Sequence, residues 1–106
     1  MSNIACDLTA LDAMQRRRRD ELQLELRELV EERQGLPDGL TFRFAGEERT
    51  LSCVAEFIAL ERLCCPFIHF EIDIAAEKGS LWVRMRGKAG VKEFLLALAS
   101  NDKAWP

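Results

Sequence analysis

The spacing of the apolar residues changes at Pro66, and that change sets the class of fold. Before the proline, the apolar residues of 50–64 recur at the spacing of an α-helix. The residue before a proline is pushed out of the α region, so this helix is expected to end at Pro66. Beyond it, apolar and polar residues alternate over 67–75 and 81–86, as they do in half-buried strands. The turn residues at 77–80 join these two stretches, so the sequence predicts a helix followed by an antiparallel hairpin.

Two further helices and one further strand are predicted around this unit. A long N-terminal helix is expected at 8–34, where most residues are good helix formers and the apolar ones form a stripe. The stripe consists of Leu22, Leu26, Leu29 and Val30. A turn at 36–39, Leu-Pro-Asp-Gly, separates that helix from a short strand at 40–45. The last helix is expected at 91–99, after two glycines, so the order of elements is α-β-α-β-β-α.

This order predicts an α+β fold with a small mixed three-stranded sheet, helices packed on one face and a long N-terminal helix. The strand-helix-strand unit at 40–75 is expected to be parallel, and the hairpin is expected to add an antiparallel strand. The hairpin residues expected to face the helices are Ile68, Phe70, Ile72, Ile74, Leu81, Val83 and Met85. A chain of 106 residues suits one core, so 1–106 is expected to be a single domain with a βαββα core at 40–100.

Charge and apolar content exclude several classes of function. The net charge of -3 gives no reason to expect binding to nucleic acid. The four arginines at 16–19 lie among acidic residues, and we interpret them as a solvated helix surface. No stretch is long and apolar enough to predict a membrane-spanning helix. The first residues lack the basic start and apolar stretch of a signal peptide, so the cytoplasm is the predicted compartment.

The chain has four cysteines: Cys6, Cys53, Cys64 and Cys65. Because no signal peptide is recognisable, we expect them to be reduced thiols rather than disulfides. Their spacing matches no standard zinc finger, since there is no Cys-x-x-Cys pair and only one histidine. Cys64 and Cys65 are adjacent at the predicted end of the second helix, and Cys53 lies on the same face. Whether Cys6 folds back to this place is left open by the sequence.

Glu61 lies on the apolar face of the predicted second helix, one turn before Cys64 and Cys65. A carboxylate on a buried face is costly unless it is ion-paired, hydrogen-bonded, protonated or bound to a metal. In one interpretation, the cysteines are small core side chains and Glu61 pairs with an arginine or with backbone donors. In the other, Glu61, Cys64 and Cys65 bind a soft or borderline metal ion such as zinc, copper(I) or mercury(II). Cys53 and His69 are candidate additional ligands in this second interpretation.

Two other functions are compatible with the same residues. The adjacent cysteines could act in thiol chemistry, one as nucleophile and the other to resolve the product, with Glu61 accepting the proton. Alternatively, the Cys-Cys-Pro segment is only a packed helix end, and the protein is an interaction module. Leu24 lies off the apolar stripe, so the N-terminal helix could join copies of the chain in a homo-oligomer. No Ser/His/Asp or Cys/His/Asn set is recognisable, so the sequence does not favour an enzyme.

Several segments of the chain resemble those of a largely uncharacterised family of small bacterial proteins. They are Ala5-Cys6-Asp7-Leu8, Leu36-Pro37-Asp38-Gly39, Phe42-Arg43-Phe44, Ala59-Leu60-Glu61-Arg62-Leu63-Cys64-Cys65-Pro66-Phe67 and Gly90-Val91-Lys92-Glu93-Phe94-Leu95. The Glu-Arg-x-Cys-Cys-Pro-Phe core is the specific part, and the resemblance covers nearly the whole chain. It implies that the site lies at this motif, and it implies no particular activity. Where that family often has Gly-Pro-Glu-Gly, this chain has Gly87-Lys88-Ala89-Gly90, so no role is expected for that glutamate.

Overall fold

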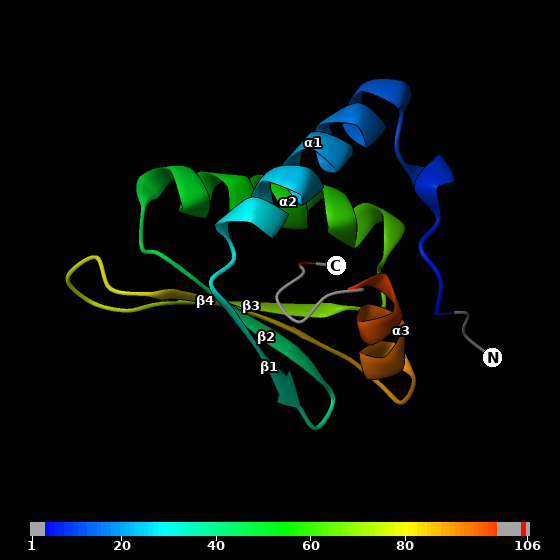
Figure 1. Ribbon diagram of the computed structural model, residues 1–106. Helices are drawn as coiled ribbons and strands as arrows, with labels where there is room; N and C mark the ends of the chain where they lie inside the picture. The colour runs from blue at the N-terminus through cyan, green and yellow to red at the C-terminus, as the bar shows by residue number, and fades with distance from the viewer. Residues whose placement is uncertain (1–3, 100–104, 106) are drawn as a thin grey trace.

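The computed structural model describes residues 4–99 and residue 105. Its elements are η1 (Leu8–Ala10, a 3₁₀ turn), α1 (Ala13–Leu29), β1 (Glu32–Leu36), β2 (Gly39–Phe44), α2 (Glu48–Cys64), β3 (His69–Ile74), β4 (Leu81–Arg86) and α3 (Val91–Leu98). In Figure 1, α1 and α2 lie over one face of the sheet, and α3 lies near one end of it. The predicted domain 1–106 and its core 40–100 also include residues at 1–3, 100–104 and 106, which lie outside the described residues. None of the helices in the described part of the chain has the length and apolar character needed to cross a membrane.

The strands of the described residues form one four-stranded antiparallel sheet in the order β1-β2-β4-β3. The predicted α+β class is confirmed, but the prediction of a three-stranded mixed sheet is wrong. The missed strand is β1, which forms a hairpin with β2. Its residues, Glu-Arg-Gln-Gly-Leu, are mostly polar and lack the alternation that marks a strand. They form one because pairing with β2 satisfies the backbone hydrogen-bonding groups on the side of β1 that faces β2.

The predicted parallel pairing within the strand-helix-strand unit is also wrong. β2 and β3 do run in the same direction, since each is antiparallel to β4, but β4 lies between them. Of the two strands of the hairpin, the inner one, β4, has the more completely buried face, made by Leu81, Val83 and Met85. β3 alternates its apolar residues with Glu71 and Asp73 and lies at the edge. Charged side chains on an edge strand discourage pairing with other chains.

The apolar face of the hairpin is oriented as predicted but is only partly buried. Ile72 pairs with Val83 and Ile74 pairs with Leu81, so these residues share one face of the sheet. The β4 residues are buried, whereas Ile72 is 40% exposed and Ile74 is 55% exposed. The difference follows from position, because no further strand flanks β3 at the edge of the described sheet.

The N-terminal helix is shorter than the predicted 8–34. α1 begins after Asp12, whose carboxylate accepts a 2.8 Å hydrogen bond from the Gln15 N–H, while the Gln15 side chain accepts one of 3.0 Å from the Asp12 N–H. It ends at Leu29, because Val30 takes an extended conformation that leads into β1. The predicted stripe is confirmed where it meets the core, at Leu22, Leu26 and Val30.

α2 carries the candidate site residues at its C-terminal end. The helix ends at Cys64, and the N–H of Cys65 closes the last turn with a 2.7 Å hydrogen bond to the Glu61 carbonyl. Pro66 follows directly, so the predicted stop is confirmed. The face that α2 turns to the core holds apolar residues together with Glu61.

Trp105 completes the core, and no periodic pattern of apolar residues around it predicts its place there. Its ring lies 4.9–5.4 Å, between centroids, from the rings of Phe42, Phe44 and Phe57. Arg27 Nε of α1 donates a 2.9 Å hydrogen bond to its carbonyl oxygen. Trp105 therefore joins α1, α2 and β2 at the centre of the fold.

Candidate functional site

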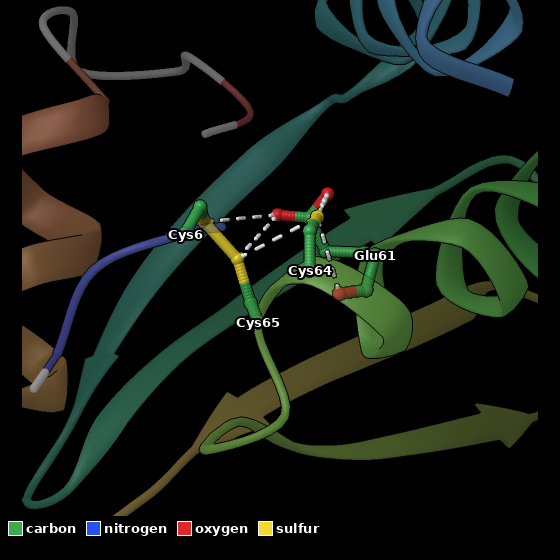
Figure 2. Close-up of side chains that lie close together, drawn as sticks. All are labelled: Cys6, Glu61, Cys64 and Cys65. Carbon is green, nitrogen blue, oxygen red and sulfur yellow. Dashed lines mark hydrogen bonds between the residues drawn. A yellow bond between two sulfur atoms is a disulfide. The ribbon is translucent and has the colours of Figure 1, made fainter. Parts of the chain in front are cut away.

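The candidate site lies where the C-terminal end of α2 meets the segment before α1. Cys64 and Cys65 come three and four residues after Glu61, so one helical turn places the three on one side of α2. The N-terminal segment brings Cys6 to the same place, because the Asp7 N–H donates a 2.8 Å hydrogen bond to the Cys64 carbonyl. Figure 2 shows Cys6 approaching the end of α2 from this separate segment. Cys6 and Cys65 are 59 residues apart, so no local pattern in the sequence links them.

Three sulfurs and one carboxylate converge at this site. The potential ligand atoms of Cys6, Glu61, Cys64 and Cys65 all lie within 4.8 Å of one another (Figure 2). Cys6 and Cys65 form a disulfide, so the expectation of reduced thiols is wrong for this pair. The Cys64 sulfur lies 3.9 Å from the Cys65 sulfur and 3.8 Å from Glu61 Oε2. Glu61 Oε1 lies 3.2 Å from the Cys65 sulfur and 3.8 Å from the Cys6 sulfur.

Arg19 of α1 is the ion-pair partner of the buried carboxylate. Its Nε donates to Glu61 Oε2 at 2.6 Å and its Nη2 donates to Oε1 at 3.2 Å, so both carboxylate oxygens accept a hydrogen bond. Glu61 is 4% exposed and Arg19 is 8% exposed. The guanidinium also lies over the ring of Phe57, 5.7 Å from its centroid. The interpretation that Glu61 pairs with an arginine is therefore confirmed.

Sequence reasoning missed Arg19 as a site residue. The interpretation of 16–19 as a solvated surface is wrong for Arg19, although it describes Arg18, which is exposed and pairs with Glu56. A signal was present, because Arg19 lies three residues before Leu22 and continues the buried stripe at helical spacing. A basic residue in a buried stripe requires an acidic partner, and Glu61 is the acidic residue on the facing helix.

Burial and charge make Cys64 a weak acid. Burial raises the pKa of the Cys64 thiol above its ordinary value, and the negative charge of Glu61 adds to this, against a smaller lowering by Arg19. For Arg19 itself, burial acts to lower the pKa, but the hydrogen bonds and charge of Glu61 outweigh burial and the pKa is raised. At neutral pH the site therefore holds an ion pair beside a protonated Cys64 thiol. Such a thiol is a poor nucleophile until a cation or a base favours the thiolate.

Two of the predicted ligands lie elsewhere in the fold. Cys53 is buried on α2 nearer its N-terminus, where burial and the charge of Glu25 raise the pKa of its thiol. His69 is exposed at the start of β3 and lines a surface pocket beside Arg86. Within the described residues, neither belongs to the cluster of potential metal ligands. The structure thus brings together Glu61, Cys64 and Cys65 of the predicted set and adds Cys6.

Comparison of the chain with family models, with curated proteins and with solved structures gave no match. The resemblance to the bacterial family with the Glu-Arg-x-Cys-Cys-Pro-Phe motif therefore stays a prediction. The chemistry of the site has to be argued from its own groups, which are three sulfurs, a carboxylate and a guanidinium.

Proposed function

We propose that this protein binds a thiophilic metal ion, such as zinc, copper(I) or mercury(II), through Cys64, Cys65 and Cys6, with Glu61 beside the ion. One observation carries the proposal: three sulfurs and a carboxylate, from two segments far apart in the chain, converge within 4.8 Å. Sulfur ligands favour soft and borderline ions. The protein binds the metal when the Cys6–Cys65 bond is reduced, because cysteine binds metal ions as a thiolate.

The charge of the site supports the binding of a cation. Arg19 and Glu61 neutralise each other, so every thiolate formed there adds a negative charge that nothing in the pair offsets. The last carbonyl groups of α2 add a partial negative charge, which further disfavours an unliganded thiolate. Of the three negative charges that Cys6, Cys64 and Cys65 carry as thiolates, a divalent ion offsets two and copper(I) offsets one. Metal binding and loss of the thiol protons are therefore coupled, and affinity should rise with pH.

Glu61 is better suited to orienting the sulfurs than to acting as the main ligand. Both of its oxygens already accept hydrogen bonds from Arg19, which fixes the carboxylate against the end of α2. Each carboxylate oxygen has a second lone pair, so Glu61 can still accept a thiol proton or a hydrogen bond from a reduced cysteine. Partners of this kind tune metal sites without being their principal ligands.

The proposal is tested by titrating the fully reduced protein with zinc and copper(I) against a chelator of known affinity. We expect the Cys64→Ser/Cys65→Ser variant to bind at least about 100-fold more weakly than the wild type, since losing ligands should cost no less than losing their outer partners. The matched control is Cys53→Ser, which removes a buried thiol outside the cluster and should leave affinity unchanged. Mercury(II) is the less discriminating probe, because accessible thiol pairs bind it readily.

Equal affinity in the wild type and the double cysteine variant would overturn the proposal. The same would follow if Cys53→Ser lost as much affinity as the double variant, because the binding thiols would then not be those of the cluster. Metal analysis of protein purified without chelator or affinity-tag metal complements the titration by identifying the ion acquired in the cell.

A role in thiol-disulfide exchange is the second candidate function, and one observation favours it. The Cys6–Cys65 disulfide lies next to the free thiol of Cys64, whose sulfur is 3.9 Å from that of Cys65. The raised pKa of Cys64 counts against it, because exchange needs a thiolate. If Cys64 takes part, Cys64→Ser should slow reduction of the disulfide by a dithiol; an unchanged rate would remove Cys64 from this role.

We also propose that the protein functions in the cytoplasm and that it associates with itself through α1. A reducing cytoplasm would keep the cysteines in the form that binds metal.

Leu24 supports the α1 contact, because it is 61% exposed on the helix, away from the buried stripe. Sedimentation of wild type and Leu24→Ser at high micromolar concentration tests the contact. A monomeric wild type would rule it out.

A further inference from the structure

We propose that the Cys6–Cys65 disulfide is a switch that turns off the metal site, so that oxidation and metal binding exclude each other. The inference rests on the proposed metal-binding function and adds its regulation. It follows from one coincidence: the two cysteines joined by the disulfide are both members of the four-residue cluster of potential ligands. Figure 2 shows the disulfide joining two of the four side chains of that cluster.

The oxidised site retains too few ligands to bind a soft ion well. A sulfur in a disulfide has no thiolate to offer, so of the three sulfurs only that of Cys64 remains. Glu61 is already bound through both oxygens to Arg19. A single thiol and a salt-bridged carboxylate make a poor site compared with three thiols.

The N-terminal segment has anchors other than the disulfide, which keep Cys6 in place when the bond is reduced. The Asp7 N–H is hydrogen-bonded to the Cys64 carbonyl, and Leu11 is buried in the core. Ile4 lies so close to Gly90 that a Cβ added there would come within 2.7 Å of its side chain. Cys6 is therefore held near the cluster in both states, and the switch needs a change of bonding rather than of fold.

Formation of the Cys6–Cys65 disulfide requires an oxidant, and a small-molecule disulfide such as oxidised glutathione can supply it. The Cys6 thiolate attacks the glutathione disulfide, forming a mixed disulfide and releasing one glutathione thiol. The Cys65 thiolate then displaces the second glutathione from Cys6. The two protein thiols lose two electrons and two protons in all, and the co-reactant gains them as two thiols. Cys6 is the first to react because it is half-buried, whereas Cys65 is fully buried.

The test compares zinc and copper(I) affinity in two forms of one preparation, one reduced with a phosphine and one oxidised with glutathione disulfide, both freed of reagent. We expect the oxidised form to bind at least about 100-fold more weakly than the reduced form. We also expect the reverse effect, because a bound ion occupies the thiolates that must attack the oxidant: metal-loaded protein should form the disulfide at least about 10-fold more slowly than metal-free protein, as counted by free thiols. The control is Cys53→Ser, which keeps both effects because Cys53 lies outside the cluster.

The outcomes separate this inference from the function on which it rests. A reduced form that binds neither ion overturns the proposed function, and the switch with it. A reduced form that binds, with equal binding by the oxidised form, overturns the switch alone. Cys6→Ser supplies the second variant, because it keeps Cys64 and Cys65 but cannot form the disulfide. Its affinity should be the same after either treatment, and a loss of affinity on oxidation of this variant would also overturn the switch.

Discussion

Arg19 and Glu61 form a buried ion pair whose members come from different helices, α1 and α2. Taking two charges out of water costs several kcal/mol, and the attraction between them offsets that cost only with good geometry. Here two hydrogen bonds link the guanidinium to both carboxylate oxygens. The pair therefore fixes how α1 lies against α2, and hence where Glu61 lies against the sulfurs, more than it adds to stability.

The first prediction follows from that balance. Arg19→Met should lower the free energy of unfolding by about 3–5 kcal/mol, because it leaves the Glu61 charge buried without its partner. The double variant Arg19→Met/Glu61→Leu should recover most of this loss, since apolar side chains of similar volume can replace a buried pair. Urea denaturation of the disulfide form measures both values.

Arg18→Met is the matched control for this prediction. Arg18 also pairs with a glutamate of α2, Glu56, but both side chains are exposed, so its loss should cost no more than about 1 kcal/mol. If Arg19→Met and Arg18→Met lost equal free energy of unfolding, breaking the buried pair would cost no more than breaking the exposed one. If Arg19→Met/Glu61→Leu were no more stable than Arg19→Met, the unpaired buried charge of Glu61 could not be the cause of the loss.

The second prediction concerns the ionisation of Cys64. In the disulfide form of Cys53→Ser, Cys64 is the remaining free thiol, and the midpoint of its thiolate absorbance in the ultraviolet against pH should lie above the roughly 8.5 of a free cysteine. A raised pKa means that the folded state holds the proton more tightly than the unfolded chain. The corresponding stability is present below the unfolded-state pKa and is lost as the pH rises through the folded-state pKa. A midpoint at or below that of the urea-unfolded protein would contradict the assignment.

At the scale of the elements, local rules predicted the features that have local causes. Pro66 ends α2 because of a steric clash with the residue before it, and the hairpin that follows has clear alternation. β1 was missed because its polar residues become a strand only through pairing with β2. The place of β4 between β2 and β3 depends on which strand face the helices bury. Alternation alone does not tell which of the two hairpin strands lies inside the sheet and which lies at its edge.

The third prediction tests the pairing of β2 with β4. A Cβ added at Gly39 would lie 1.9 Å from the carbonyl oxygen of Met85, so Gly39→Ala has to push the two strands apart. We expect it to destabilise the protein by about 1–3 kcal/mol, as overpacking does. Gly35→Ala on β1 is the control, because the nearest atom would be Lys92 Nζ at 3.5 Å, and we expect a change within about 0.5 kcal/mol. Thermal or urea unfolding that ranked the two glycines equally would contradict this strand order.

The candidate site was predictable to the extent that it lies on one helix. Glu61, Cys64 and Cys65 share a side of α2 by helical spacing, and the cost of burying a carboxylate marked them as a unit. Arg19 was within reach of the same reasoning, since it continues a stripe that was recognised. Cys6 was not, because its approach depends on a chain path of 59 residues that no local pattern describes.

At the scale of the whole molecule, the disulfide joins the N-terminal segment to the end of α2. It closes a span of 59 residues, which limits the freedom of the unfolded chain far more than that of the folded one. The fourth prediction is that reducing this bond lowers the free energy of unfolding by about 4 kcal/mol, the chain-entropy value for a loop of this length. The comparison is made by urea denaturation with and without a phosphine reductant, with a chelator present in both so that metal does not stabilise the reduced form.

Two variants show whether breaking the Cys6–Cys65 bond causes the loss of unfolding free energy on reduction. Cys64→Ser keeps the disulfide and should show the same loss on reduction as the wild type. Cys6→Ser cannot form the bond, so its stability should not depend on the reductant. A dependence in Cys6→Ser as large as in the wild type would assign the effect to other thiols and contradict the prediction.

If the cysteines of the cluster are metal ligands, X-ray absorption at the zinc edge of the reduced, zinc-loaded protein should detect sulfur bound to the ion. We expect a sulfur shell of two to three atoms at about 2.3 Å. The shell should be largely lost in Cys64→Ser/Cys65→Ser and unchanged in Cys53→Ser. A shell of nitrogen and oxygen alone, at about 2.0–2.2 Å in the wild type, would show that these cysteines do not bind the metal.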